Sequence, residues 1–135
     1  MTEYNKPLPL SGPITEEFWR AAKNHELHLQ QCRDCQEYIF YPRELCPGCL
    51  SSDLNWVKVS GRGKVYSYTV VRQALHPAFK EDVPYILAII ELEEGPHLTS
   101  NVVDCEIEDI RVDMPVTAVF DDVTPEITLV KFRPA

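Results

Sequence analysis

The chain has no long apolar run and no segment that resembles a targeting signal. Its longest apolar stretch, VPYILAII at 83–90, is far shorter than the roughly 20 residues that a membrane-spanning helix needs. The amino-terminal MTEYNKPLPLSGP carries an acid at Glu3 and lacks the apolar core of a secretory signal. We therefore expect a cytoplasmic protein that has no contact with a membrane.

Motifs for nucleotide binding and for catalysis are also missing. No Gly-x-Gly-x-x-Gly or P-loop occurs, and GRGK at 61–64 precedes a predicted strand rather than a helix. Cys105 has no histidine near it in the sequence, so we expect a buried thiol rather than a nucleophile. The histidines show no spacing typical of metal ligation: His25, His28, His76 and His97. We predict no catalytic residues and no enzyme activity of the chain by itself.

Positive charge is scarce in the C-terminal third. The formal net charge is −8, and residues 91–126 contain eleven acids against one base, Arg111. Nucleic-acid binding draws much of its affinity from lysines and arginines that neutralise phosphates. We therefore expect no nucleic-acid partner. Because small barrels joined to metal ribbons often bind nucleic acids, a nucleic-acid-binding module stays the alternative function.

Cysteine, by contrast, is concentrated in one short stretch, CRDCQEYIFYPRELCPGC at 32–49. In a reducing compartment, paired cysteines bind metals more often than they form disulfides. Zinc takes four sulfur ligands at tetrahedral corners, and two Cys-x-x-Cys turns supply all four. We predict one structural Zn²⁺ held by Cys32, Cys35, Cys46 and Cys49. With no ligand position left open, its role is to order a segment too small to hold a core of its own.

The rest of the chain predicts a mainly β protein. Residues 1–13 are expected to form a proline-rich arm, 14–25 a helix capped by Thr15, and 26–31 a strand that leads into the first cysteine pair. The connector between the cysteine pairs is expected to form a short hairpin. Five further β-rich runs follow, at 64–72, 84–93, 97–104, 115–120 and 126–132. Five short strands favour an oligonucleotide- and oligosaccharide-binding (OB) barrel, with a sandwich as the alternative.

These elements divide the chain into three predicted segments. Residues 1–25 form an arm and a helix, 26–57 a metal ribbon, and 58–135 the five-stranded barrel. The helix is too short to be stable alone, so we expect it to pack on the core or on a partner.

In this order, the segments resemble the DUF35 family, a rubredoxin-like zinc ribbon followed by an OB fold and associated with acyl-CoA chemistry. The sequences that carry the resemblance are KPLPL, EEFW, ELHLQQCRDC, FYPRELCPGC, the spacing of Trp56 and Gly61, GKVYSYTVV, VPYILAIIELEEG, NVVDCE and MPVTAVF. The chain departs from the family at Gln36, Leu50, Asn24–His25 and Asp113, where a glycine or small residue is common. A side chain at a left-handed position costs about 1 kcal/mol, which metal ligation can offset.

The resemblance implies a non-catalytic accessory subunit of an acyl-CoA-processing enzyme complex. Members of the family accompany thiolase-fold enzymes and, less often, acyl-CoA hydratases or aldolases, and their partners carry the catalytic residues. We therefore expect a hetero-oligomer that shares CoA or acyl-CoA with a thiolase-fold subunit. The small subunit of a benzoylsuccinyl-CoA thiolase-type complex is the most specific form of this expectation.

Two sets of residues are candidates for contacts in such a complex. A small basic cluster beside the loop at 61–64 is expected to meet the phosphates of CoA: Arg43, Arg62 and Lys64. Aromatic side chains of the helix and the ribbon are expected to anchor the partner: Phe18, Trp19, Tyr38 and Phe40. For Phe18 and Trp19, packing against the protein's own barrel is the alternative.

Overall fold

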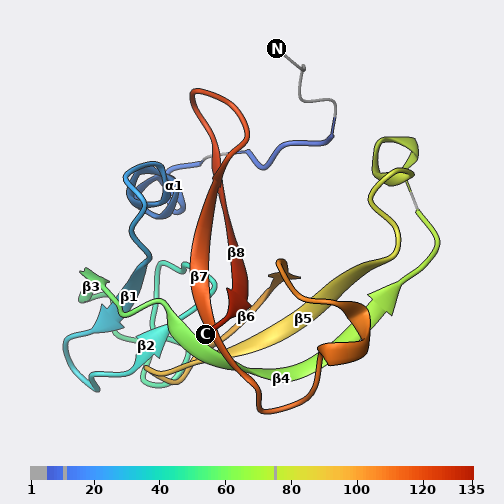
Figure 1. The fold of residues 1–135 in the computed structure, drawn as a ribbon. Helices are drawn as coiled ribbons and strands as arrows, with labels where there is room; N and C mark the ends of the chain where they lie inside the picture. Colours follow the sequence, from blue (N-terminus) through green and yellow to red (C-terminus); the bar gives the residue numbers. More distant parts are fainter. Residues whose placement is uncertain (1–5, 11, 75) are drawn as a thin grey trace.

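Figure 1 shows the fold in a computed structural model that describes residues 6–10, 12–74 and 76–135. The predicted arm therefore lies partly outside the described residues, at 1–5 and 11. The elements are α1 (Glu16–Lys23), β1 (His28–Cys32), β2 (Tyr38–Ile39), β3 (Leu54–Lys58), β4 (Arg62–Val71), η1 (Pro77–Phe79), β5 (Tyr85–Leu92), β6 (His97–Val102), η2 (Ile107–Asp109), β7 (Pro115–Asp122) and β8 (Thr128–Pro134). No helix within these ranges is long and apolar enough to cross a membrane.

The start of α1 differs from the prediction. The helix begins at Glu16, two residues later than expected, and the Thr15 side chain makes no capping hydrogen bond to the helix. Instead, the backbone N–H of Gly12 donates to Thr15 Oγ1 at 3.0 Å. Thr15 therefore occupies the N-cap position as predicted, but its hydroxyl orders the turn before the helix and does not cap it.

The end of α1 is set by a Schellman motif. The N–H of Glu26 donates to the carbonyl of Ala21, and the N–H of His25 donates to the carbonyl of Ala22, both at 2.9 Å. This pair of bonds requires a left-handed residue after the helix, and His25 takes that role with φ 60°. The helix therefore ends at Lys23, and the chain turns directly into β1.

The ribbon is a three-stranded sheet in which β1 is central and β2 and β3 pair with it antiparallel. The predicted strand at 26–31 is confirmed as β1, shifted to His28–Cys32. The connector between the cysteine pairs does not form a hairpin of its own, because its strand β2 pairs with β1 instead. Strands β1 and β2 thus form a hairpin whose turn contains the first Cys-x-x-Cys pair. The pairing of these strands and the metal site therefore depend on the same residues.

The five predicted β runs form a closed barrel in the order β4-β5-β6-β8-β7. This five-stranded Greek-key arrangement is that of the OB fold, so the predicted barrel is confirmed and the alternative sandwich is wrong. The barrel is weakly joined at one place. Strands β6 and β8 run parallel and pair only at Val102 and Phe132, whereas β7 and β8 pair over seven residues. We call this β6–β8 junction the seam.

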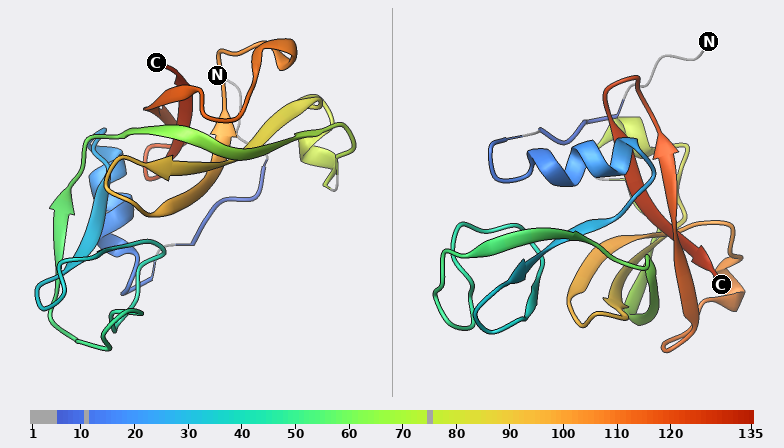
Figure 2. Two further views of the ribbon diagram at one scale, coloured as in Figure 1. Left: turned by 90° about the horizontal axis from the view of Figure 1, so that it is seen from below. Right: turned by 90° about the vertical axis from the view of Figure 1, so that its left-hand side faces the viewer.

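The larger of two buried apolar clusters joins the helix, the ribbon and the barrel. Phe18 of α1 and Leu27 and Leu29 at the ribbon pack in one buried cluster with barrel residues such as Val65 and Phe132. In the right-hand view of Figure 2, α1 lies over the ribbon and beside β7 and β8, and it contacts β1, β7 and β8. The core thus crosses both of the predicted segment boundaries, at 25 and at 57, and those boundaries stay a prediction.

Four residues that stand where the family commonly has glycine or a small residue adopt left-handed backbone. Their φ angles are 60° at His25, 64° at Gln36, 65° at Leu50 and 71° at Asp113. Gln36 and Leu50 each close a Cys-x-x-Cys turn, since their N–H groups donate to the carbonyls of Cys32 and Cys46 at 2.8 Å. The backbone strain expected from a side chain at a left-handed position is therefore present at all four residues.

Replacing Leu50 by glycine should stabilise the protein. The Leu50 side chain is 73% exposed, so its removal loses little packing, while glycine relieves about 1 kcal/mol of backbone strain. Denaturant unfolding of the metal-loaded chain measures the difference. Leu45→Gly is the matched control, because Leu45 is also exposed but has no left-handed backbone. A Leu50→Gly variant no more stable than the parent would contradict this explanation.

Candidate metal centre and the adjoining groove

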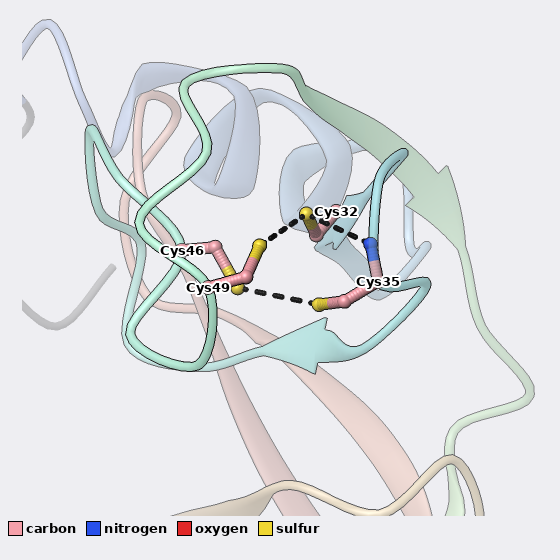
Figure 3. Close-up of side chains that lie close together, drawn as sticks. All are labelled: Cys32, Cys35, Cys46 and Cys49. Atoms are coloured by element: carbon pink, nitrogen blue, oxygen red, sulfur yellow. Dashed lines mark hydrogen bonds between the residues drawn. The ribbon is translucent and has the colours of Figure 1, made fainter.

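The two Cys-x-x-Cys turns face each other at one end of the ribbon sheet (Figure 3). Cys32 is the last residue of β1, and Cys35 lies in the turn to β2. Cys46 and Cys49 lie in the loop between β2 and β3, which the N–H of Cys46 fastens by donating to the carbonyl of Ser51 at 2.9 Å. Each turn therefore presents its two sulfurs toward those of the other.

The distances between the four sulfurs fit a tetrahedral metal ion. The sulfurs of Cys32 and Cys49 are 3.5 Å apart, those of Cys35 and Cys46 are 3.6 Å apart, and all four lie within 4.8 Å of one another. A zinc ion with Zn–S bonds of about 2.3 Å places its sulfurs about 3.8 Å apart. Disulfide sulfurs, in contrast, are separated by about 2.05 Å. The predicted ligands are therefore brought together as a metal site and not as disulfides.

Backbone N–H groups prepare two of the sulfurs for metal binding. The N–H of Cys35 points at the sulfur of Cys32 at 3.5 Å, and the N–H of Gly48 points at that of Cys46 at 3.4 Å. The Cys35 N–H is the main reason why the pKa of Cys32 falls to about 7. Although the Glu37 N–H favours the Cys35 thiolate, burial and the neighbouring sulfurs raise the pKa of Cys35 to about 12. Four thiolates this close therefore require a cation between them.

The ribbon has little apolar core around the metal site. Cys32, Ile39 and Cys46 form a separate buried cluster, with Leu54 packed against it. Burying one cluster of three small or medium side chains stabilises a fold by only a few kcal/mol, whereas structural zinc contributes an apparent ~10–16 kcal/mol. With four protein ligands, the site also has no open position for a substrate. Its geometry is that of a structural metal site.

The comparisons with known proteins agree with this geometry. Residues 19–55 match a family model described as the ChsH2 rubredoxin-like zinc ribbon domain, and residues 56–121 match that of the ChsH2 C-terminal OB-fold domain. A DUF35 domain-containing scaffold protein of Methanocaldococcus jannaschii is 45% identical over 104 residues, which are 76% of this chain and 73% of that protein. The chain belongs to the DUF35 family.

Two further matches are to a longer protein and to a chain of a named aldolase structure. A probable enoyl-CoA hydratase alpha subunit of Thermomonospora curvata is 41% identical over 96% of this chain, which spans only 40% of the length of that subunit. Among solved structures, the Ltp2-ChsH2(DUF35) aldolase contains a similar chain, with a TM-score of 0.84 and 37% identity over 94% of this chain and 98% of that one.

A groove adjoins the metal ribbon where the helix, the ribbon and the barrel meet. It has a volume of about 320 Å³ and is walled by Phe18 and Trp19 of α1 and by Phe40 and Tyr41 of the ribbon. The rings pack on one another, with centroids 5.0 Å apart for Phe18 and Trp19 and 5.6 Å apart for Phe18 and Phe40. The floor is the seam, at residues 98–101 of β6 and 129–131 of β8. We call this cavity the seam groove.

The seam groove brings together three of the four predicted interface residues. Phe18 is only 7% exposed and belongs to the protein's own core, so the alternative of packing against the barrel describes it well. Trp19 and Phe40 are partly buried and face the groove. Tyr38 packs against the core but does not line the groove. An interface role for these residues stays a prediction.

The structure does not gather the predicted basic residues around one cavity. Arg62 and Lys64 line a shallow depression with Glu91 and Glu93, apart from the seam groove. Each has an acidic partner: Arg62 Nε lies 3.2 Å from Glu93, and Lys64 Nζ lies 3.6 Å from Asp113.

Arg43 is held differently: it follows Pro42, which lines the seam groove, but does not itself line that groove. The buried Gln30 side chain clamps the Arg43 backbone: its amide donates to the Arg43 carbonyl at 2.8 Å, and its oxygen accepts from the Arg43 N–H at 2.7 Å. Sequence reasoning identified Arg43 but missed Gln30 and the seam, because the contacts of both are distant along the chain.

Loss of the metal should unfold the ribbon and leave the barrel folded. Chelation, or a Cys46→Ser substitution, removes the main stabilising interaction of residues 26–57, while the barrel retains its own strand pairing. Hydrogen exchange followed by mass spectrometry should show loss of protection in the ribbon alone. Cys105→Ser is the control, because this cysteine lies outside the four-sulfur cluster. Equal protection of the ribbon with and without metal would refute the structural role.

Proposed function

We propose that this chain is a non-catalytic, zinc-stabilised scaffold subunit of an acyl-CoA-processing enzyme complex. The observation that carries the proposal is the seam groove: an aromatic cavity walled by the helix and the metal-stabilised ribbon, with strand edges as its floor. Zinc is the proposed ion, because a closed set of four thiolates suits it and nothing in the site serves redox chemistry. The names of the relatives support the scaffold role.

The partner is the catalytic subunit. A thiolase-fold enzyme is our first candidate, from the resemblance to DUF35 proteins. An acyl-CoA hydratase or an aldolase is the second, and the names of the Thermomonospora curvata relative and of the aldolase structure favour it. In each case, aromatic side chains at the rim of the seam groove would anchor the interface, as buried aromatic residues do in stable complexes. The complex would be a hetero-oligomer.

CoA or acyl-CoA would be shared between the two subunits. The pantetheine arm of CoA alternates amides with apolar carbons, which suits a groove that has aromatic walls and strand edges on its floor. Arg43, held beside the groove by Gln30, is our candidate for the phosphates of CoA, since a guanidinium binds phosphate through paired hydrogen bonds. The same role for Arg62 and Lys64 stays a prediction, and both would first have to leave their acidic partners.

Purification from the native host should recover a stoichiometric enzyme of the thiolase, hydratase or aldolase class. Trp19→Ala should weaken that association by roughly tenfold or more, as expected for an aromatic anchor. Tyr66→Ala is the control, since Tyr66 is an exposed aromatic residue on β4 outside the seam groove. Tight binding of an oligonucleotide with steep salt dependence, and no enzyme partner, would instead establish the nucleic-acid alternative.

Charge reversal at Arg43 should weaken CoA binding by the purified complex. We expect Arg43→Glu to reduce the affinity measured by titration calorimetry at least tenfold, through lost phosphate hydrogen bonds and added repulsion. Arg33→Glu is the control, because Arg33 lies on the ribbon and pairs with Asp53 and Asn55. The double variant Arg62→Glu and Lys64→Glu tests the second basic pair. Full affinity of the Arg43 variant would exclude the assigned contact but leave the scaffold role standing.

A further inference from the structure

His28 differs from the other histidines in that both of its ring nitrogens face carboxylates. Its Nδ1 lies 2.9 Å from Glu17 Oε2, and its Nε2 lies 2.9 Å from Glu26 Oε1. The His28 side chain is only 16% exposed. Ionised carboxylates accept hydrogen bonds and cannot donate them, whereas a neutral imidazole has a single N–H. Both contacts can therefore be hydrogen bonds only when His28 is the doubly protonated imidazolium.

The charged groups around His28 come from three elements. Arg20 on α1 donates to both oxygens of Glu17, at 2.7 and 2.9 Å to Oε1 and at 2.7 Å to Oε2. Lys58 on β3 lies 3.6 Å from Glu26. Arg20 and then His28 lower the pKa of Glu17, and His28 is the main cause of the lowered pKa of Glu26. Both acids therefore stay ionised to a lower pH than usual. Above that pH, the state of the cluster depends on the protonation of His28.

This cluster connects α1 to the ribbon. Glu17 is in the first turn of the helix, and His28 is the first residue of β1. A helix of eight residues is not stable in isolation and depends on such tertiary contacts. Phe18 and Trp19, which directly follow Glu17, form one wall of the seam groove. The contact between His28 and Glu17 therefore helps to position that wall.

The other three histidines have contacts that a neutral ring can make. His25 uses Nε2 alone toward Asp122, at 2.9 Å, and His97 uses Nε2 alone toward Glu91, at 3.4 Å. The Nδ1 of His76 accepts a hydrogen bond from the Ala78 N–H at 3.0 Å. Within the part of the chain that the structure describes, only His28 needs both protons.

We propose that His28 is a protonation-dependent latch that holds α1 against the ribbon and so fixes the helical wall of the seam groove. When the ring loses one proton, it also loses one of the two hydrogen bonds. The remaining lone pair then faces a carboxylate, which is repulsive. The latch is engaged while the ring is doubly protonated and is loosened once the ring is neutral. It does not depend on the identity of the partner or on CoA.

Hydrogen exchange of the α1 amides at two pH values tests the latch. In the intact, metal-loaded chain, protection of residues 16–23, corrected for intrinsic exchange rates, should be roughly tenfold higher at a pH where both ring nitrogens of His28 are protonated than at a higher pH where only one is. Barrel amides should show no such step. Nitrogen NMR of the His28 ring should show two protonated nitrogens at the lower pH. Equal corrected protection of the helix at the two pH values would overturn the proposal.

Two variants separate the latch from a general effect of pH. In Glu26→Gln, the new amide can donate to a neutral Nε2 while Nδ1 donates to Glu17, so the helix should stay ordered and the tenfold step should vanish. His28→Gln should also abolish the step, and His97→Gln should keep it, because that exposed histidine does not touch α1. If His28→Gln fails to fold, Glu26→Gln decides alone. A step retained in Glu26→Gln would refute the latch.

Discussion

The structure depends on the convergence of four cysteine sulfurs at one end of a small sheet. The hairpin of β1 and β2 turns at the first cysteine pair, and the second pair closes the long loop before β3. The apolar cluster at this end is limited to Cys32, Ile39 and Cys46. A metal ion therefore supplies the stability that burial of apolar surface does not, and the rest of the ribbon is positioned by it.

The helix α1 connects this end of the molecule to the barrel. The helix packs on β1 of the ribbon and on β7 and β8 of the barrel, and Phe18 belongs to the core that all three share. Gln30 on β1 fixes the loop that follows β2 by clamping the backbone of Arg43. The seam groove lies between these parts, so its shape depends on the metal, on the helix and on the barrel together.

Sequence predicted the local features well because their signals are local. The spacing of Cys32, Cys35, Cys46 and Cys49 is enough to indicate a tetrahedral site, and the alternating β runs of 64–132 are enough to indicate a small barrel. The family's glycine positions correctly pointed to left-handed backbone at His25, Gln36, Leu50 and Asp113, because backbone geometry is retained when the residue changes. The left-handed backbone at His25 also explains why α1 ends in a Schellman motif.

Features that join distant parts of the chain were not predictable in this way. The seam depends on the pairing of β6 with β8. The clamp on Arg43 depends on Gln30, thirteen positions away, and the His28 cluster depends on the packing of α1 against β1. The sequence suggested that the basic residues near Gly61 form one cluster. In the structure, Arg62 instead pairs with Glu93 and Lys64 with Asp113, both of which are distant along the chain. Charge near in sequence is therefore a weak guide to charge near in space.

The most direct test of this account is X-ray absorption at the zinc edge of the purified protein. The account predicts one zinc ion per chain with four sulfur neighbours at about 2.3 Å and no nitrogen or oxygen in its first coordination shell. A metal-free protein with a folded ribbon, or a coordination shell that contains oxygen or nitrogen ligands, would contradict it.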